Sequence, residues 1–388
     1  MNLTIFSHKL CWPSNNSSSG YATDGGFPFQ MQALSELFES TTVVVPCLKY
    51  GQVTGETQLV GNNLTIVPLS QPLGKDLLRK LLLPTWLLQN FPKILHEVWR
   101  ADAVHTPIPS DIGTIGMLLA FVLRKPLFVR HCGTWKIQRT VAERFWHWYM
   151  EQFASSKHVM LATGGDVSPP SPKNPNIKWI FASSVTMEEI TACSTGRSPR
   201  SEDAGYRLIT VCRQEIEKGT DIVIRSLSLL VDIPYITLDI VGTGGAIPTL
   251  KLLVESLQLV DRVRFHGKLD HNQVLQILKQ SDLFCYPTQA FEGFPKVVLE
   301  ALACGVPVIT TRISVLPLLI EQGCGILLSE PAPTDLAQSI RKCIFDEKMY
   351  QSMSEQAIMV AKQYSLEHWR DEIGAQLQSA WGVLRSND

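Results

Sequence analysis

A chain of 388 residues is long enough for two or three domains of about 150 residues each. Because 45% of its residues are hydrophobic and only 18% are charged, it can form large cores, which excludes an intrinsically disordered protein. The net charge of −1 excludes a dedicated nucleic-acid-binding protein, so no nucleic-acid partner is expected.

The cysteines and the first residues predict a cytoplasmic location. Nine cysteines are scattered along the chain with no C-x-x-C pair and no metal-ligand spacing, as is typical of reduced core thiols. The start MNLTIFSHKL lacks the basic and apolar regions of a signal peptide, and no apolar run reaches about 18 residues. We therefore expect neither a signal peptide nor a transmembrane helix.

Short apolar runs alternate with helical stretches in both halves of the chain. In the first half, the runs that predict strands are 3–6, 41–46, 64–69, 103–106, 126–131, 158–163 and 177–182. In the second half, they are 207–212, 236–242, 263–267, 283–287, 307–310 and 325–328. The helices expected between the latter include 221–231, 248–259 and 271–281. This alternation predicts parallel sheets covered by helices, with ligands bound beyond the carboxyl ends of the strands.

A polar stretch, STGRSPRSEDAG at 194–205, comes just before a new first strand. Segments that join domains are typically exposed and rich in glycine, proline and polar residues. We therefore predict one Rossmann-like domain over residues 1–195 and a second over residues 205–365.

The stretch at 74–99, GKDLLRKLLLPTWLLQNFPKILHEVW, combines leucines and tryptophans with basic residues. One interpretation is a peripheral contact with a membrane, in which the segment lies in the interface of an anionic bilayer. The other is an ordinary pair of core-facing helices broken at Pro84 and Pro92. The sequence leaves both interpretations open.

Two loops in the first half carry candidate binding groups. Gly25 and Gly26 form a glycine-rich turn between the first strand and a helical pattern; the alternative is a flexible surface loop. His131 follows an apolar strand, where it could hydrogen-bond a substrate hydroxyl or phosphate. The alternative for His131 is a buried imidazole whose hydrogen bonds are satisfied.

Two cations follow the first strand of the second half. Arg213 and Lys218 lie in TVCRQEIEKG, beyond the predicted end of the strand. Two cations in that position can clamp a pyrophosphate. The alternative is a solvated basic loop in which they pair with Glu215 and Glu217.

A glycine-rich loop, DIVGTGGAIP at 239–248, follows the next strand. It is a weaker pattern than the dinucleotide-binding motif G-x-G-x-x-G. The Asp or Glu that would hydrogen-bond the ribose, expected about 20 residues later, is not evident. We therefore interpret Gly242 as a position where the backbone approaches a ligand, or where a helix approaches a strand.

The stretch FEGFPKVVLEALACG, which begins at Phe291, predicts a loop followed by a helix. Pro295 suits the first helical turn, and the next amides then face an anion at the positive end of the helix. Glu292 stays in the loop. Glu300 lies in an otherwise apolar helical segment, where a carboxylate needs a partner such as a sugar or ribose diol. The alternative is an ion pair of Glu300 across a domain surface, with Glu292 as an ordinary loop residue.

In their order, these motifs resemble the retaining GT-B glycosyltransferases of family 4, the glycosyl transferases group 1. The likeness rests on Arg213 with Lys218-Gly219, followed by VGTGG, VRFHGKL and SDLFCYPTQAFEGFPKVVLEALACGVPVIT. It is dense over residues ~205–330 and looser in the first half. The tail SLEHWRDEIGAQLQSAW is similar to the last helix of the family.

The resemblance implies an α/β protein with the GT-B fold, in which two Rossmann-like domains face each other across a cleft. The domain at 1–195 would bind the acceptor, and the domain at 205–365 would bind the nucleotide-sugar donor. Residues 366–388 would form a C-terminal helix that crosses back to the N-terminal domain.

The resemblance also implies roles for individual residues. Glu300 would bind the ribose hydroxyls of the donor, Glu292 its sugar, and Arg213 and Lys218 its diphosphate. The catalytic residues implied are Glu292, Arg213, Lys218 and His131. The donor-binding residues implied are Glu300, Gly293, Phe294, Pro295, Lys296, Val297, Gly242, His266, Lys268, Leu269, Gly25 and Gly26. There are two departures from the family pattern: Cys212 replaces a glycine, and ASSVT at 182–186 replaces a segment like N-G-V-D.

We therefore expect an enzyme that moves a hexosyl group from a UDP- or GDP-linked sugar to a hydroxyl acceptor with retention of configuration. Polysaccharide, lipopolysaccharide or glycolipid synthesis is the expected context, with a lipid-linked saccharide as a candidate acceptor at the inner face of a membrane. The alternatives are another GT-B enzyme, such as a sugar-nucleotide epimerase, and a non-catalytic sugar-nucleotide-binding module. A NAD dehydrogenase is disfavoured by the missing acidic ribose reader. No Asp-x-Asp occurs in the chain, and two cations and a helix N-terminus can neutralise a leaving diphosphate, so no metal cofactor is expected.

Overall fold

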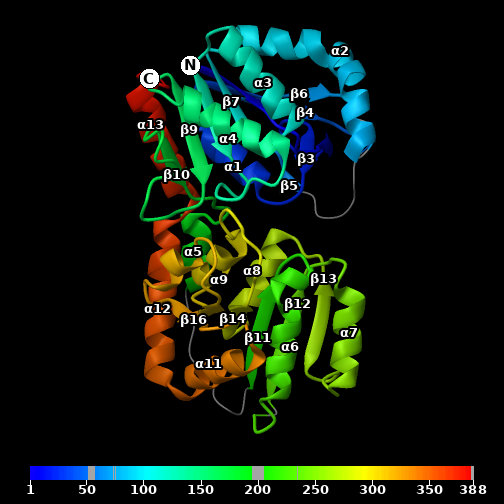
Figure 1. Ribbon diagram of the computed structural model, residues 1–388, viewed down its shortest axis with the longest axis vertical. Helices are drawn as coiled ribbons and strands as arrows, with labels where there is room; N and C mark the ends of the chain where they lie inside the picture. The colour runs from blue at the N-terminus through cyan, green and yellow to red at the C-terminus, as the bar shows by residue number, and fades with distance from the viewer. Residues whose placement is uncertain (51–56, 73, 75, 195–204, 234, 386–388) are drawn as a thin grey trace. The chain divides into compact units, whose positions relative to one another are not determined.

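The structure is a computed structural model that describes residues 1–50, 57–72, 74, 76–194, 205–233 and 235–385. The chain forms two compact units (Figure 1): unit 1 comprises Met1–Phe181 and Trp369–Asp388, and unit 2 comprises Ala182–His368. The division falls at Phe181, ahead of the polar stretch 194–205 where the sequence places the boundary. The reason is that α5 (Met187–Ser194) packs against helices of unit 2. Residues 195–204 of the predicted boundary lie outside the described residues.

Unit 1 is built on a seven-stranded parallel sheet with the order β10-β9-β8-β7-β1-β4-β6. Its strands are β1 (Asn2–Phe6), β4 (Ser40–Pro46), β6 (Leu64–Leu69), β7 (Ala103–Ile108), β8 (Leu127–His131), β9 (His158–Thr163) and β10 (Ile177–Ile180). The predicted apolar runs match these strands to within two residues. Strands buried on both faces read as nearly continuous apolar runs, which is why the sequence reveals them.

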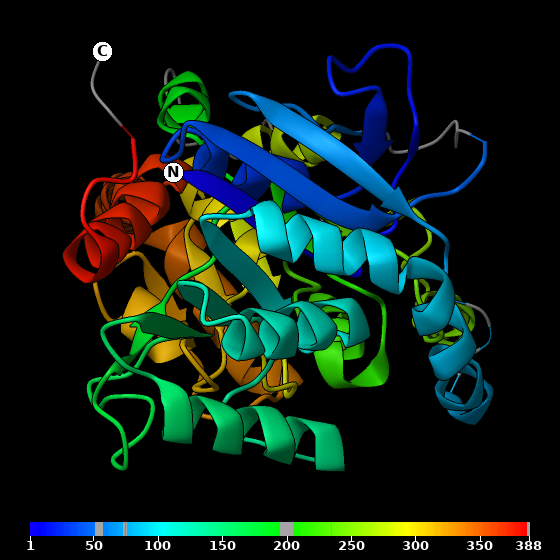
Figure 2. The ribbon, with the colours of Figure 1, turned by 90° about the horizontal axis from the view of Figure 1, so that it is seen from above.

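Three helices cover one face of this sheet: α2 (Asp76–Arg100), α3 (Asp111–Val122) and α4 (Val141–Phe153). Figure 2 shows them side by side. The other helices of this unit are α1 (Phe27–Ser35) and the C-terminal helix α13 (Leu366–Trp381). At the end of β8, the buried Arg130 donates to Gln30 of α1 (2.9 Å) and lies 5.0 Å from the ring centroid of Trp369 in α13. A small antiparallel sheet of β2 (Trp12–Pro13), β3 (Tyr21–Thr23) and β5 (Thr57–Gln58) was not predicted.

Helix α2 is continuous, so the predicted break at Pro84 and Pro92 is wrong. Both prolines are exposed, where water can hydrogen-bond the carbonyls that the prolines leave without a helical partner. Trp86, Ile94 and Val98 of the same helix are buried in the core of unit 1. The core-facing interpretation therefore holds for one side of α2.

Unit 2 is built on a six-stranded parallel sheet with the order β13-β12-β11-β14-β15-β16. Its strands are β11 (Tyr206–Val211), β12 (Ile236–Val241), β13 (Val263–Gly267), β14 (Leu283–Tyr286), β15 (Val308–Thr310) and β16 (Gly325–Leu327). Besides α5, its helices are α6 (Thr220–Ser228), α7 (Ile247–Ser256), α8 (His271–Lys279), α9 (Lys296–Ala303), α10 (Leu316–Ile320), α11 (Pro333–Phe345) and α12 (Glu347–Gln363).

The strand order of unit 2 reverses between β11 and β14. The connections that leave these two neighbouring strands therefore run in opposite directions along the sheet. In open parallel sheets, ligands bind in the crevice that this reversal opens at the carboxyl ends of the strands. The loops after β11 and β14 therefore border the crevice in which a ligand is expected to bind.

Candidate functional site

The loops after β11 and β14 pack directly against each other. The amide of Gln289 donates to the carbonyl of Glu217 at 2.8 Å. Gly219 has a φ of +73°, and a Cβ added there would lie 2.3 Å from the carbonyl oxygen of Pro287. Only glycine fits this position, because any side chain would meet backbone.

The loop after β11 is also held from the β12 side. The buried Gln214 donates from Nε2 to the carbonyl of Val241 at 2.9 Å and accepts from Oγ1 of Thr220 at 2.7 Å. A Cβ at Gly242, whose φ is +115°, would lie 1.9 Å from the carbonyl oxygen of Cys212. Gly242 thus permits one loop backbone to approach another, and its predicted contact with a donor stays a prediction.

Lys218, Glu292 and Tyr286 form a polar cluster at the switch point. Lys218 is only 3% exposed and forms an ion pair with Glu292. The Tyr286 hydroxyl donates to Oε2 of Glu292 at 2.9 Å and lies 3.5 Å from Nζ of Lys218. Burial and the Glu292 carboxylate raise the pKa of Tyr286, so its hydroxyl stays protonated at neutral pH. The alternative of a solvated loop is wrong for Lys218, because it is buried and its ionic partner is Glu292.

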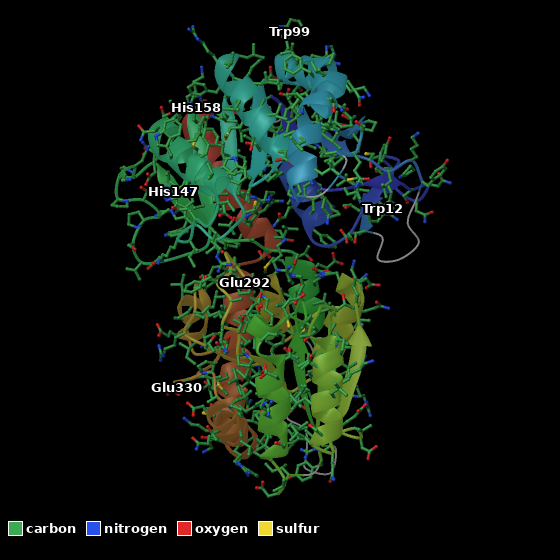
Figure 3. The ribbon with its side chains drawn as sticks, turned by 45° about the vertical axis from the view of Figure 1, so that its right-hand side comes forward. Trp12, Trp99, His147, His158, Glu292 and Glu330 are labelled. Carbon is green, nitrogen blue, oxygen red and sulfur yellow. The ribbon has the colours of Figure 1, made fainter. Side chains whose placement is uncertain are left out.

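Figure 3 shows Glu292 at the end of unit 2 toward which the strand arrows point. The exposed Arg213 leaves the same edge of the sheet, one residue after Cys212. Within the part of the chain that the structure describes, the Arg213 guanidinium has no hydrogen-bond or ion-pair partner. At this edge of the sheet, Lys218 is thus a cation held in an ion pair, and Arg213 is a cation whose guanidinium is available to a ligand.

Helix α9 begins at this edge without a side-chain cap. Pro295 is its N-cap residue, so it precedes the first helical turn in which the sequence places it. The helix itself begins at Lys296 and Val297, both half-buried. Before them, Gly293 is half-buried, and the buried Phe294 lies 5.6 Å from the ring of Tyr364. An uncapped N-terminus with its partial positive charge is suited to an anion.

Glu300 lies in α9 and is 7% exposed. Its Oε1 accepts a hydrogen bond from Oγ of Ser184 at 3.1 Å and lies 3.3 Å from Nδ1 of His271. The other ring nitrogen of His271, Nε2, lies 3.0 Å from Oε1 of Glu189. Glu300 thus does form an ion pair, as the alternative has it, but with His271 inside unit 2 and not across a domain surface.

His271 carries a positive charge in this arrangement. Burial alone would lower its pKa, but the hydrogen bonds and charges of Glu189 and Glu300 outweigh burial and raise the pKa to about 10. The imidazolium can then donate from both ring nitrogens, one to each carboxylate.

The residues predicted to flank the base lie at the end of β13 and directly after it. Nε2 of His266 lies 2.7 Å from Oδ1 of the buried Asp239 on β12. Lys268 is exposed and Leu269 is half-buried in the connection to α8. These residues lie two strands from β11.

The predicted residues of unit 1 lie at the ends of β8 and α1. His131 is 3% exposed, burial lowers its pKa to about 4, and the Trp135 ring meets it edge-on at 5.3 Å. The imidazole is thus buried, as the alternative has it, and a hydrogen bond with the backbone of Gly133 opposes the lowering of its pKa. Its predicted contact with a substrate stays a prediction. Gly25 has a φ of +70° with open space around it, and Gly26 is the N-cap of α1.

Sequence reasoning missed four polar residues of these clusters: Tyr286, His271, Ser184 and Glu189. Tyr286 lies in an apolar strand and reads as core. Ser184 lies in ASSVT, the segment that departs from the family pattern. The capping box that Asp270 forms with Gln273 marks the start of α8 at His271, but it does not reveal the partner of His271.

Comparison with known proteins finds a family model that matches most of the second half of the chain. Residues 197–359 match the family model described as Glycosyl transferases group 1. N-acetyl-alpha-D-glucosaminyl L-malate synthase of Bacillus anthracis is 38% identical over 119 residues, 30% of each chain. D-inositol 3-phosphate glycosyltransferase of Corynebacterium jeikeium is 31% identical over 157 residues, 38% of this chain and 37% of the relative. The chain thus spans about a third of the length of the curated relatives it matches.

Solved structures extend the likeness to the whole fold. The Anabaena protein HepE (Alr3699), crystallised in complex with UDP, superposes with a TM-score of 0.70 at 18% identity. The superposition covers 98% of this chain and 100% of HepE. The predicted GT-B fold is thereby confirmed.

Proposed function

Since residues 197–359 belong to the glycosyl transferases group 1 family, we propose that the protein transfers a sugar from a nucleotide-diphosphate sugar to a hydroxyl acceptor. The observation that carries this proposal is the charge arrangement at the switch point of unit 2. Arg213, which has no side-chain partner among the described residues, lies at the carboxyl edge of the sheet with the ion-paired Lys218 and the N-terminus of α9, which has no side-chain cap. Together they suit a diphosphate that gains charge as it leaves.

Retention of configuration is part of the proposal. An intermediate on Glu292 is disfavoured because Lys218 pairs with its Oε1 and Tyr286 donates to its Oε2. The simplest scheme is then attack from the face that the diphosphate leaves, with a diphosphate oxygen accepting the proton of the acceptor hydroxyl. An α-linked donor would give an α-glycoside, which the anomeric proton coupling of the first-formed product reports.

The donor is proposed to be UDP- or GDP-linked. HepE was crystallised with UDP and with UDP-glucose, which supports a uridine nucleotide. A panel of nucleotide sugars, screened first for protection against thermal unfolding and then for transfer, tests this. A ligand at 100 times its Kd adds about 2.7 kcal/mol of stability.

The decisive test compares three variants. Lys218→Ala and Glu300→Gln should each lower turnover by about 10²-fold or more, because Lys218 would neutralise the leaving diphosphate and Glu300 would hold the donor ribose in position. Arg225→Ala, which removes an exposed cation from α6, should leave turnover unchanged. Folded Lys218→Ala protein with full turnover would contradict the proposal. An epimerase would alter the nucleotide sugar without an acceptor, and a binding module would bind it without turnover.

We further propose a lipid-linked saccharide as the acceptor and an anionic membrane face as the place of action. Large apolar side chains are exposed on the three helices that cover one face of unit 1: Leu78, Leu81, Leu88, Phe91, Leu95, Trp99, Leu118, Val122, Val141, Phe145 and Trp148. We call this set the outer face of α2–α4. Trp99 projects from it at the end of α2 (Figure 3).

Exposed cations lie on and beside this outer face: Lys93, Arg100, Arg124, Arg139 and Arg144. A surface that combines leucine, tryptophan and arginine is suited to the interface of an anionic bilayer. None of the described helices is both long enough and apolar enough to span a bilayer. The proposed contact is therefore a peripheral one.

A further inference from the structure

The two carboxylate oxygens of Glu300 have different surroundings. Oε1 accepts from Ser184 at 3.1 Å and lies 3.3 Å from Nδ1 of His271. Oε2 has no hydrogen-bond partner among the residues that the structure describes. One oxygen is thus held by the protein, while the other keeps its lone pairs for a ligand.

His271 reaches Glu300 from a separate element that is itself anchored. It is the first residue of α8, and its Nε2 lies 3.0 Å from Oε1 of Glu189 on α5. Oε2 of Glu189 in turn accepts from the amide of Thr186 at 2.8 Å and from its hydroxyl at 3.2 Å. The chain of contacts runs from Thr186 through Glu189 and His271 to Glu300, across three helices.

Charge explains why the link needs a histidine. Glu300 sits among Val298, Leu299 and Ala301, all buried, and an unpaired carboxylate there would be costly. A buried cation that donates to it keeps the carboxylate ionised and fixes its rotamer. Glu189 supplies the second negative charge that keeps His271 protonated.

We propose that His271 is a positioning residue for the donor ribose: it holds Oε1 of Glu300, so that Oε2 faces the ribose diol and accepts from it. Ser184 supports the same oxygen, and Glu189 orients the imidazole. The inference rests on the proposed function in one respect only, namely that Glu300 receives a ribose diol.

The test separates a loss of ribose-diol recognition from a general loss of nucleotide affinity. Binding of UDP and of 2′,3′-dideoxy-UDP is measured by calorimetry on the full chain, with the GDP pair used in the same way. Wild-type protein should prefer the ribonucleotide at least tenfold, and Glu300→Gln should remove most of that preference. His271→Ala should also reduce the preference several-fold and leave dideoxynucleotide affinity unchanged. Asn272→Ala, at the exposed next position of α8, should change neither.

His271→Asn is the second variant, since asparagine keeps one donor near the position of Nδ1 without the charge. It should fold even where alanine does not, and it should restore part of the preference. If either folded His271 variant keeps the full wild-type preference, or loses affinity for both nucleotides equally, the inference is overturned while the proposed function stands. Wild-type protein that binds neither nucleotide pair would instead contradict the proposed function, and the inference with it.

Discussion

At the scale of single residues, the two glutamates eight positions apart each pair with a cation that is buried or half-buried. Lys218 pairs with Glu292, and His271 pairs with Glu300. Breaking such a pair by removing one partner typically costs about 3–5 kcal/mol, because it leaves a buried charge uncompensated. Both glutamates are therefore held in place before any ligand arrives.

The His271 pairing predicts a defined dependence of stability on pH. The carboxylates of Glu189 on α5 and Glu300 on α9 raise the pKa of His271 from 6.5 to about 10. Because the folded-state pKa is the higher one, the stabilisation is fully present below pH 6.5 and is lost as the pH rises through 10. The melting temperature of His271→Asn should therefore lie furthest below that of the wild type near pH 6.

The measurement is a series of thermal melts of both proteins between pH 6 and pH 10. The gap between the two melting temperatures should narrow steadily across this series. A gap that stays constant from pH 6 to pH 10 would show that the charge of His271 contributes nothing to stability. Asn272→Ala serves as the control and should show no gap at any pH.

At the scale of elements, the sequence predicted what depends on neighbours along the chain. The strands of both sheets follow from apolar runs, and the loop positions of Lys218 and Glu292 follow from the strand ends. What it missed depends on distant contacts. Glu300 and its donor Ser184 are 116 residues apart, and His271 lies 82 residues from Glu189. The continuity of α2 through Pro84 was likewise missed, because a helix can continue past a proline where the carbonyls left unpaired find other partners, and the local pattern does not show this.

The close contact of the β11 and β14 loops predicts different outcomes for two glycines with the same backbone. Gly219 (φ +73°) and Gly267 (φ +67°) both lie in the left-handed region, but only Gly219 would place a Cβ against backbone. Gly267→Ala should cost about 1–2 kcal/mol of unfolding free energy from the conformation alone. Gly219→Ala should cost clearly more and should also lower turnover, because the loop carrying Lys218 must shift.

Urea unfolding monitored by tryptophan fluorescence measures both costs. Gly267→Ala is the matched control, since no atom lies within 4 Å of its added Cβ. An equal loss of unfolding free energy in the two variants would mean that the loop after β14 moves aside at no measurable cost. The role assigned to the loop contact would then be wrong.

The outer face of α2–α4 predicts binding to anionic vesicles. Leu88 on α2 is 78% exposed, and Leu252 on α7 of unit 2 is 66% exposed, so the two form a matched pair. Leu88→Glu should abolish sedimentation with vesicles that contain about 30% anionic lipid, because a negative charge on the outer face of α2–α4 opposes its insertion into the bilayer interface. Leu252→Glu should sediment like the wild type.

Salt provides the second arm of the vesicle experiment. Binding should weaken at about 0.5 M NaCl, where charge interactions are screened. Equal binding to neutral and anionic vesicles would contradict the electrostatic part of the proposal. Protein that never sediments with vesicles but forms dimers through α2 would assign the outer face to a second copy of the chain.

At the scale of the whole molecule, the charges that would neutralise a leaving diphosphate come from the chain itself. Arg213, Lys218 and the α9 terminus supply them from three positions at one edge of the sheet of unit 2. We therefore expect transfer to proceed at an undiminished rate after treatment with EDTA. The measurement is the initial rate with and without chelator, with the chelator removed as a control. Complete loss of activity that Mg²⁺ or Mn²⁺ restores would contradict this expectation.

The division of the chain has a consequence for the order of its synthesis. Unit 1 begins with Met1–Phe181 but is finished only by Trp369–Asp388, whereas unit 2 is one uninterrupted segment. A ribosome therefore releases all of unit 2 before the last helix of unit 1 emerges, and until then Arg130 lacks the Trp369 ring beside it. Chains truncated after His368 and released from the ribosome should accordingly contain a protease-resistant unit 2 and a protease-sensitive unit 1. In the gene, the coding sequence of unit 2 is one continuous segment between the two segments that encode unit 1. Recombination at two points would therefore exchange the whole of unit 2 between two such proteins.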